Sequence, residues 1–136
     1  MKLIFVAILA TLALYSCRKD EPNAITGNDD LVGTWVNPQY NDTLITYISA
    51  AALKENEPGY TFKTDYSLIC RENSGWCGTP PITTADYGGS WIMSDSIVTI
   101  KTSYWGGKVE YTWKIITLTN QKLVVWVQKA EYQGGK

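Results

Sequence analysis

The sequence predicts an all-β protein, a small antiparallel up-and-down barrel of eight strands that follows a signal peptide and a flexible tether. Three observations lead to this prediction. From Leu31 onward the apolar segments are short, rich in β-branched and aromatic residues, and separated by Gly, Pro, Asn or Asp. Their number is even, which lets an up-and-down barrel close. A separate apolar run at the amino terminus stops at a cysteine that charged residues follow.

Residues 1–16 have the features of an export signal. Lys2 carries a positive charge, and residues 3–14 are apolar apart from Thr11. This run is shorter than the roughly 20 residues that a helix needs to cross a bilayer, and charged residues follow it closely. We therefore expect a signal peptide over residues 1–16 that is removed, rather than a membrane span.

The end of this segment, Leu14-Tyr15-Ser16-Cys17, resembles the lipobox of bacterial lipoproteins. The resemblance implies that Cys17 is lipidated, with acyl chains such as palmitate, and that it becomes the first residue of a membrane-anchored protein. A plain secreted protein with a chance cysteine is the alternative. The triplet Lys19-Asp20-Glu21 resembles a signal for the outer face of the outer membrane, with a charged linker as the alternative. The expected location is the outer membrane, exposed at the cell surface.

Composition limits the functions open to the mature chain, which has one domain's worth of residues. Removal of the signal peptide takes away one of the 12 basic side chains, Lys2, and none of the 13 acidic ones, so the mature chain has a net charge near −2. Such a charge balance gives nucleic acid nothing to bind. The absence of histidine removes the commonest general base and metal ligand. We predict no catalysis, no metal and no cofactor. The carboxylates available to an enzyme lie beside turns or strand ends, where solvated acidic residues are ordinary: Asp65, Glu72, Asp86 and Asp95.

The predicted domain order is a lipidated cysteine and disordered tether over residues 17–30, a barrel over 31–130 and a tail over 131–136. A run containing Gly88-Gly89 is either two strands or one bent strand with a bulge. Only the second interpretation gives an even count that closes. The predicted strands are Leu31–Val36, Thr43–Ser49, Tyr60–Lys63, Tyr66–Arg71, Ile82–Met93, Ser96–Thr102, Lys108–Leu118 and Lys122–Lys129.

Turn signals separate these strands. Residues 38–42 are predicted to turn the first strand into the second, whose β-branched residues favour a strand over a helix. Thr64-Asp65 is predicted to join a hairpin, and Asn120-Gln121 the last one. In the strand that starts at Lys108, alternate residues are apolar, which predicts one face toward the core and one toward water.

Two cysteines remain besides Cys17. Cys70 and Cys77 form an even pair in an exported chain, which predicts a disulfide across a short loop, contributing about 2–3 kcal/mol. Two reduced thiols with Cys77 buried are the alternative.

The first strand, with Gly33 and Trp35 in "LVGTWV", is similar to the G-x-W signature of lipocalins. The stretches "YTFKTDYSLI", "GGSWIMSDSIVTI" and "YTWKIITLTNQKLVVW" look like the strand pairs of lipocalin-like bacterial surface lipoproteins. The resemblance implies a small barrel with Trp35 across its base and an interior able to hold an apolar molecule. The chain is shorter than classical lipocalins, so ligand residues do not carry over. A barrel of this size either fills with side chains or holds one small ligand.

The predicted function is a binding protein for a small hydrophobic molecule or a glycan. Six Trp and eight of the nine Tyr lie after residue 16, and both residue types suit ligand-binding faces. Trp76 and Trp105, with Tyr104 beside the latter, lie on Gly-flanked connections that share one end of an eight-stranded barrel. Their alternative role is to plug that end. The alternative function is a non-catalytic accessory lipoprotein that docks on another envelope protein.

Overall fold

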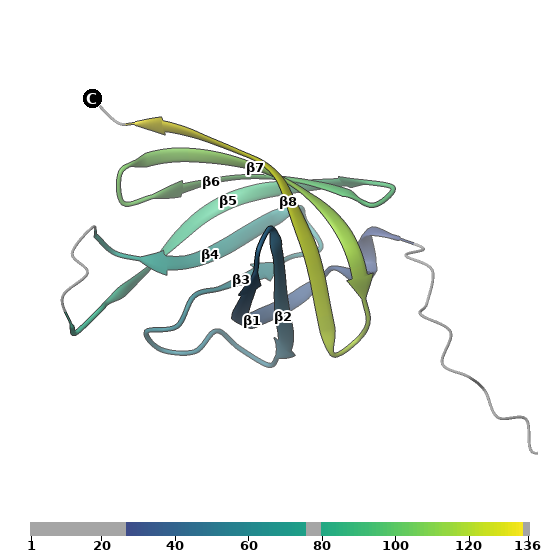
Figure 1. Cartoon of the computed structure of the whole chain (residues 1–136), viewed down its shortest axis with the longest axis horizontal. Helices are drawn as coiled ribbons and strands as arrows, with labels where there is room; N and C mark the ends of the chain where they lie inside the picture. The colour runs from purple at the N-terminus through teal and green to yellow at the C-terminus, as the bar shows by residue number, and fades with distance from the viewer. Residues whose placement is uncertain (1–26, 76–79, 135–136) are drawn as a thin grey trace, which may run out of the picture.

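The structure is a computed structural model that describes residues 27–75 and 80–134. It is a closed antiparallel barrel of eight strands, which confirms the predicted fold class and is compatible with a lipocalin-like fold (Figure 1). Within the described ranges no helix is long and apolar enough to span a membrane. The elements are η1 (Asn28–Asp30), β1 (Gly33–Asn41), β2 (Leu44–Ala50), β3 (Gly59–Phe62), β4 (Ser67–Asn73), β5 (Thr84–Ser94), β6 (Ile97–Tyr104), β7 (Gly107–Leu118) and β8 (Lys122–Gly134).

The strands from β3 to β8 follow one another around the barrel, and the β1–β2 hairpin closes it. The last strand pairs with β2, not with β1, and β1 pairs with β3. If the first strand closed directly on the last, β1 would pair with β8 and β2 with β3. The observed pairing is possible because residues 51–58 leave β2 and pass over the outside of β1 before β3 begins.

We call residues 51–58 the strap. Trp35 faces the interior, so its neighbour Val36 faces outward, yet Val36 is only 1% exposed. The strap covers it: a Cβ added at Gly59 would lie 2.9 Å from Leu53 Cδ2 and 3.3 Å from Val36 Cγ1. The outer face of β1 therefore has a small apolar contact of its own, separate from the barrel core.

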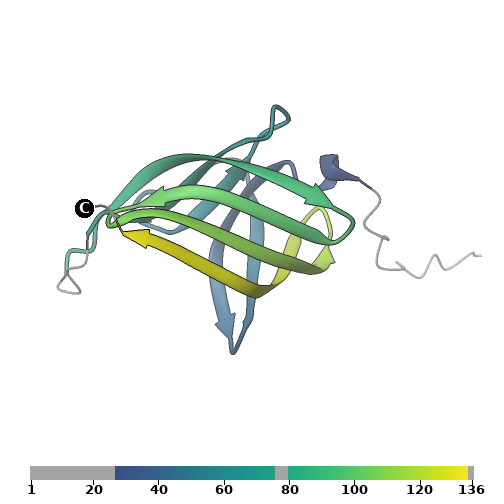
Figure 2. The same ribbon diagram turned by 90° about the horizontal axis from the view of Figure 1, so that it is seen from above.

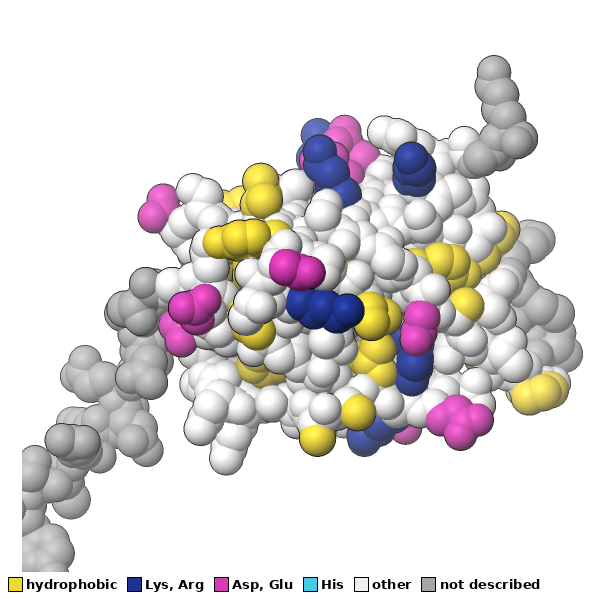
Figure 3. All heavy atoms as spheres, turned by 180° about the vertical axis from the view of Figure 1, so that it is seen from behind, with side chains coloured by type: hydrophobic (Ala, Val, Ile, Leu, Met, Phe, Trp, Pro, Cys, Tyr) yellow, Lys and Arg dark blue, Asp and Glu magenta, His cyan; other side chains and the backbone are white. Residues whose placement is uncertain are grey.

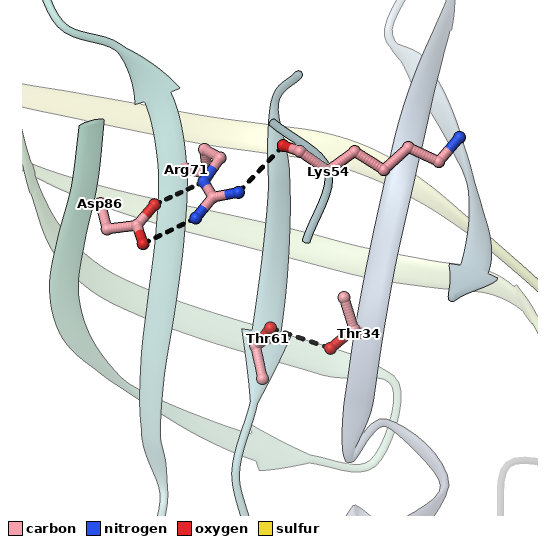
Figure 4. A network of polar contacts seen from close by, with 5 residues as sticks. All are labelled: Thr34, Lys54, Thr61, Arg71 and Asp86. Atoms are coloured by element: carbon pink, nitrogen blue, oxygen red, sulfur yellow. Dashed lines mark hydrogen bonds and ion pairs between the residues drawn. The ribbon is translucent and has the colours of Figure 1, made fainter. Parts of the chain in front are cut away.

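A polar network holds the strap in place (Figure 4). The Arg71 guanidinium donates to the Lys54 carbonyl oxygen at 2.9 Å and to both carboxylate oxygens of Asp86, at 2.6 and 2.9 Å. The hydroxyls of Thr34 and Thr61 join β1 to β3 at 2.9 Å. Since Arg71 and Asp86 are direct cross-strand partners, β4 and β5 together anchor the strap.

Two expected features of the strands differ in the structure. Of the predicted turn over residues 38–42, only Asp42 lies in the turn that joins β1 to β2: β1 runs on to Asn41, with a register shift between Val36 and Gln39 and a positive φ of 55° at Asn37. The β1–β3 pairing ends at Val36, so Pro38 lies where β1 has a neighbour on one side only and its missing N–H is tolerated.

Strand β5 is a single strand, as predicted, but the glycine pair within it is not a bulge. The β4–β5 ladder continues to Gly89 and Ser90 without a register shift. A Cβ at Gly89 would lie 2.2 Å from the Lys101 carbonyl oxygen, so glycine is needed there for a close backbone approach between β5 and β6.

The chain is also ordered further at both ends than expected. Residues 28–30, assigned to the tether, form η1, and residues 131–134, assigned to the tail, pair with residues 107–110 of β7. The predicted signal peptide, Cys17 and the Lys19, Asp20 and Glu21 triplet lie outside the described residues.

Side chains fill the closed part of the barrel. Trp91, Trp113 and Phe62 are the largest, each at most 2% exposed. The Phe62 ring stands edge-on to both tryptophans, with centroids 5.5 and 6.3 Å away. Of the two possibilities for a barrel of this size, the structure has the filled interior. The other members of the core are Leu31, Trp35, Tyr47, Tyr60, Leu68, Cys70, Val98, Ile100, Ile115, Leu118, Leu123 and Val125.

Candidate binding site at the tyrosine end of the barrel

The inner surface of the barrel changes character along its length. One end holds η1, Leu31 and the turn between β3 and β4, and we call it the closed end. The other holds the β6–β7 turn, the start of β5 and the last residues of β8 (Figures 1 and 2, left). Strand alternation places several tyrosines on the inner surface toward this end, and we call them the tyrosine face. Its members are Tyr40, Tyr47, Tyr60, Tyr87, Tyr104, Tyr111 and Tyr132.

Ring contacts connect the core to the rim of the tyrosine face. Trp113 contacts Tyr60 at 5.0 Å, Tyr47 at 5.9 Å and Tyr111 at 6.3 Å between centroids. Tyr111 then meets Tyr132 at 6.1 Å, with the two hydroxyls 3.3 Å apart. Tyr47 and Tyr60 are buried, whereas Tyr132 is 59% exposed. The aromatic surface thus runs from the sealed interior out to solvent.

A carboxylate lies beside these rings. Glu72 follows Cys70 at the next inward position of β4, opposite Ala85 of β5, and it is partly buried. Burial raises its pKa. Burial, followed by the negative charge of Glu72, raises the pKa of Cys70 to about 12. Burial is also the main cause that raises the pKa values of Tyr47 and Tyr60, and the charge of Glu72 adds to it. The strand register places Glu72 on the same inner surface as Tyr60 and Tyr87, which are the cross-strand partners of Cys70.

The charged residues of the neighbouring strands lie on the outer side of the sheet and pair there. Asp86 binds Arg71, Lys101 lies 3.6 Å from Glu110, and Lys129 lies 2.8 Å from Glu131. None of the ion pairs within residues 27–75 and 80–134 includes Glu72. On the face shown in Figure 3, acidic and basic side chains likewise lie next to one another among small hydrophobic patches.

Trp113 adds a second polar group without a partner. Its Nε1 is buried and has no hydrogen-bond acceptor in the described part of the chain. Trp35 and Trp91, the other buried core tryptophans, both donate to backbone carbonyls. Buried donors are nearly always satisfied, so an unsatisfied indole N–H beneath the tyrosine face marks this region as unusual.

Two of the predicted ligand residues join this site. Tyr104 meets Tyr132 at 5.3 Å, and Trp105, 51% exposed on the β6–β7 turn, meets Tyr104 at 5.8 Å. A Cβ at Gly106 would lie 2.6 Å from the Tyr104 ring, so glycine lets that ring fold back over the turn. Trp76 lies outside the described residues. Ligand binding by all three stays a prediction.

The other candidate carboxylates are separated from this site. Asp65 accepts hydrogen bonds from the backbone N–H and hydroxyl of Ser67 in the β3–β4 turn, Asp86 binds Arg71, and Asp95 lies in the β5–β6 turn with φ at 55°. In the described ranges no group of three or more His, Cys, Asp or Glu side chains could hold a metal ion. The sequence pattern grouped Glu72 with carboxylates at turns and strand ends. The signal for an inward-facing Glu72 was its spacing of two residues from Cys70, because residues two apart in a strand lie on the same face.

The predicted Cys70–Cys77 disulfide is not supported. Cys70 is a free thiol, 1% exposed, and it faces the core opposite Tyr60 of β3. Cys77 lies outside the described residues. The prediction rested on an even pair of cysteines and the short loop between them, but strand alternation directs Cys70 into the barrel.

A separate hollow of about 380 Å³ lies on the outer side of β5 to β8. Lys101, Lys108, Glu110 and Gln133 line it, beside Gly88, which has no side chain to fill the space. The hollow is open, and its Lys101 and Glu110 already pair. It therefore offers less to a ligand than the tyrosine face on the other side of the sheet.

Trp35 is buried, and its Nε1 donates to the Leu31 carbonyl at the closed end, at 2.9 Å. Comparison of the chain with protein-family models, curated proteins and solved structures found no match.

Proposed function

We propose that this protein is a lipid-anchored, lipocalin-like binding protein of the outer membrane, exposed at the cell surface, that captures a small molecule on its tyrosine face. One observation carries the proposal: inward-facing tyrosines from β6, β7 and β8 contact one another at one end of the barrel, beside an exposed Trp105. Exposed aromatic surface of this kind is costly to leave in water and is typical of binding sites.

The filled interior determines where a ligand would lie. Because Trp91, Trp113 and Phe62 occupy the closed part of the barrel, a guest rests across the tyrosine face and not inside the barrel. Each ring that stacks on a guest contributes about 1 kcal/mol. The rings already contact one another, so little side-chain freedom is lost on binding.

Binding is tested by titrating the full-length protein in detergent with envelope glycans, bile-acid-like steroids and fatty acids while Trp fluorescence is followed. Tyr132→Ala should weaken the binding of a responding compound about fivefold or more, since a stacking contact is lost. Tyr66→Ala is the control, because Tyr66 is 47% exposed at the closed end. No response from any class, or equal binding by wild type and Tyr132→Ala, would overturn the proposal.

The anchor is tested separately. A Cys17→Ser variant should leave the membrane fraction, and full membrane association of that variant would contradict lipidation. Whole-cell protease should remove the barrel of the wild-type protein. Replacement of Lys19, Asp20 and Glu21 by Ala should protect it, and equal digestion would show that the triplet is only a linker.

Docking on another envelope protein is the second candidate. It is favoured by apolar side chains on the outer face of the closing seam: Trp126 is 40% exposed, opposite Leu44 of β2, and Ile48 is 42% exposed. Pull-down from detergent-solubilised membranes tests it. A stoichiometric partner that Trp126→Ser abolishes would favour docking, and recovery of the protein alone would count against it.

A further inference from the structure

The tyrosine face has a marked electrostatic asymmetry. Along β4 the inward positions are Leu68, Cys70 and Glu72, and the inward positions of β5 to β8 are apolar, aromatic, glycine or hydroxyl-bearing. Strand alternation directs the lysines, the arginine and the other carboxylates of these strands outward. Among the described residues Glu72 is therefore the charged group of this surface.

Nothing on the described inner surface compensates that charge. Glu72 is partly buried, and the ion pairs of neighbouring strands form on the opposite side of the sheet. The residues that its charge influences are tyrosines and a thiol: Tyr40, Tyr47, Tyr60, Cys70 and Tyr111. A partly desolvated carboxylate is unfavourable unless a cation pairs with it.

The arrangement of the rings suits a compact cation. Tyr104 and Tyr132 stand at 86° to one another, and Tyr132 and Tyr111 at 90°. Both contacts are edge-to-face, so the three rings are tilted against one another and do not form a flat platform. Tyrosine faces attract cations within about 6 Å of the centroid, and tyrosines grouped in this way recognise quaternary ammonium ligands.

We infer that the tyrosine face is selective for an organic cation, a protonated or quaternary amine, with Glu72 as its counter-ion; this inference rests on the proposed function, which places the ligand on that face. The ammonium group lies against the Tyr104, Tyr111 and Tyr132 rings, and apolar substituents extend toward Trp105. Glu72 repels anionic ligands such as fatty acids from the same surface.

A matched pair of ligands isolates the charge. Choline and 3,3-dimethyl-1-butanol have nearly the same shape, but only choline is positively charged. Calorimetric titration of the full-length protein in detergent should show choline binding about tenfold or more tighter than the alcohol. Added salt should reduce the preference, because the attraction to Glu72 is partly screened.

The variants assign the preference to Glu72. Glu72→Gln keeps the shape of the side chain and should bring the choline-to-alcohol affinity ratio close to one. Glu110→Gln, the matched change on the outer face, should leave the ratio unchanged. Circular dichroism confirms folding of each variant. If Glu72→Gln folds poorly, Glu72→Asp serves as the second variant. It retains the negative charge and should keep most of the preference for choline over the alcohol.

The outcomes separate this inference from the proposed function. Equal binding of choline and the alcohol, or a preference that survives Glu72→Gln, overturns the cation inference. If a neutral glycan or steroid still binds and Tyr132→Ala weakens it, the proposed function stands without a cationic ligand. If no compound responds to Tyr132→Ala, both fail.

Discussion

The buried tryptophans of the barrel differ in whether their indole N–H groups have hydrogen-bond acceptors. At the closed end, Trp35 donates to the Leu31 carbonyl, and Trp91 donates to the carbonyls of Lys63 and Ser67, each at 3.2 Å. Beneath the tyrosine face, the buried Trp113 indole N–H lacks an acceptor within the described residues. An aromatic side chain with a satisfied polar tip stabilises the fold, whereas one with an unsatisfied tip remains able to bind something else.

The difference has a structural cause. At the closed end, backbone carbonyls lie within reach of the indole nitrogens: the Leu31 carbonyl accepts from Trp35, and the Lys63 and Ser67 carbonyls accept from Trp91. At the tyrosine end, β6, β7 and β8 extend past the β2–β8 pairing, which stops at Trp126 (Figure 2). Among the described residues, side chains line the inner surface there.

The largest expected effect is at the closed end. Trp35→Ala should lower the free energy of unfolding by about 3–5 kcal/mol, because it empties a buried site at the closed end and leaves the Leu31 carbonyl without its donor. Tyr104→Ala at the tyrosine end should cost less than about 1 kcal/mol. Denaturant unfolding of both variants checks this, and similar losses would remove the contrast between the ends.

A pair of identical changes sharpens the comparison. Trp91→Phe and Trp113→Phe remove the same atoms from buried sites, but only the first breaks hydrogen bonds. Trp91→Phe should therefore be the more destabilising by about 1–2 kcal/mol. Thermal and denaturant unfolding measure the difference. Equal losses would indicate that the Trp113 N–H is satisfied in solution.

Glu72→Gln should stabilise the protein at pH 7, by about 0.5–2 kcal/mol. Burial raises the pKa of Glu72 above its ordinary value of 4.5, so the folded state binds more protons than the unfolded state. Stability therefore falls as pH rises from 4.5 through the raised pKa, and the Gln variant escapes this loss.

The advantage of Glu72→Gln should vanish below about pH 4.5, where Glu72 is protonated in both states. Unfolding curves across this range test the prediction, with Glu110→Gln on the outer face of the barrel as the control. A destabilised Gln variant at pH 7 would mean that Glu72 has a cationic partner within the protein, which would also contradict the cation inference.

The smallest effect belongs to the outside of the barrel. Asp86→Asn weakens the bidentate contact with Arg71, but Asp86 is 47% exposed, so the loss should be about 0.5 kcal/mol or less and should shrink in high salt. Arg71 keeps its bond to the Lys54 carbonyl, which holds the strap. A loss as large as that of Trp91→Phe would show that the strap contributes as much as the closed end.

Much of the fold followed from local patterns. Alternation in "VEYTWKI" placed Val109, Tyr111, Trp113 and Ile115 on one face, as observed, and the even strand count predicted closure. Element ends were harder. The continuation of β8 to Gly134 depends on residues 107–110 as partners, which no local signal in the "EYQGGK" tail reveals.

The sequence by itself determined the strands, their inward and outward faces and the fold class, because side-chain periodicity of two is a property of each strand alone. Tertiary structure decided the rest. The pairing of β8 with β2, the strap over Val36, the meeting of Glu72 with tyrosines from four other strands and the unsatisfied Trp113 N–H all depend on closure of the barrel. Closure sets the register between strands that are distant in sequence, and local patterns carry no information about that register.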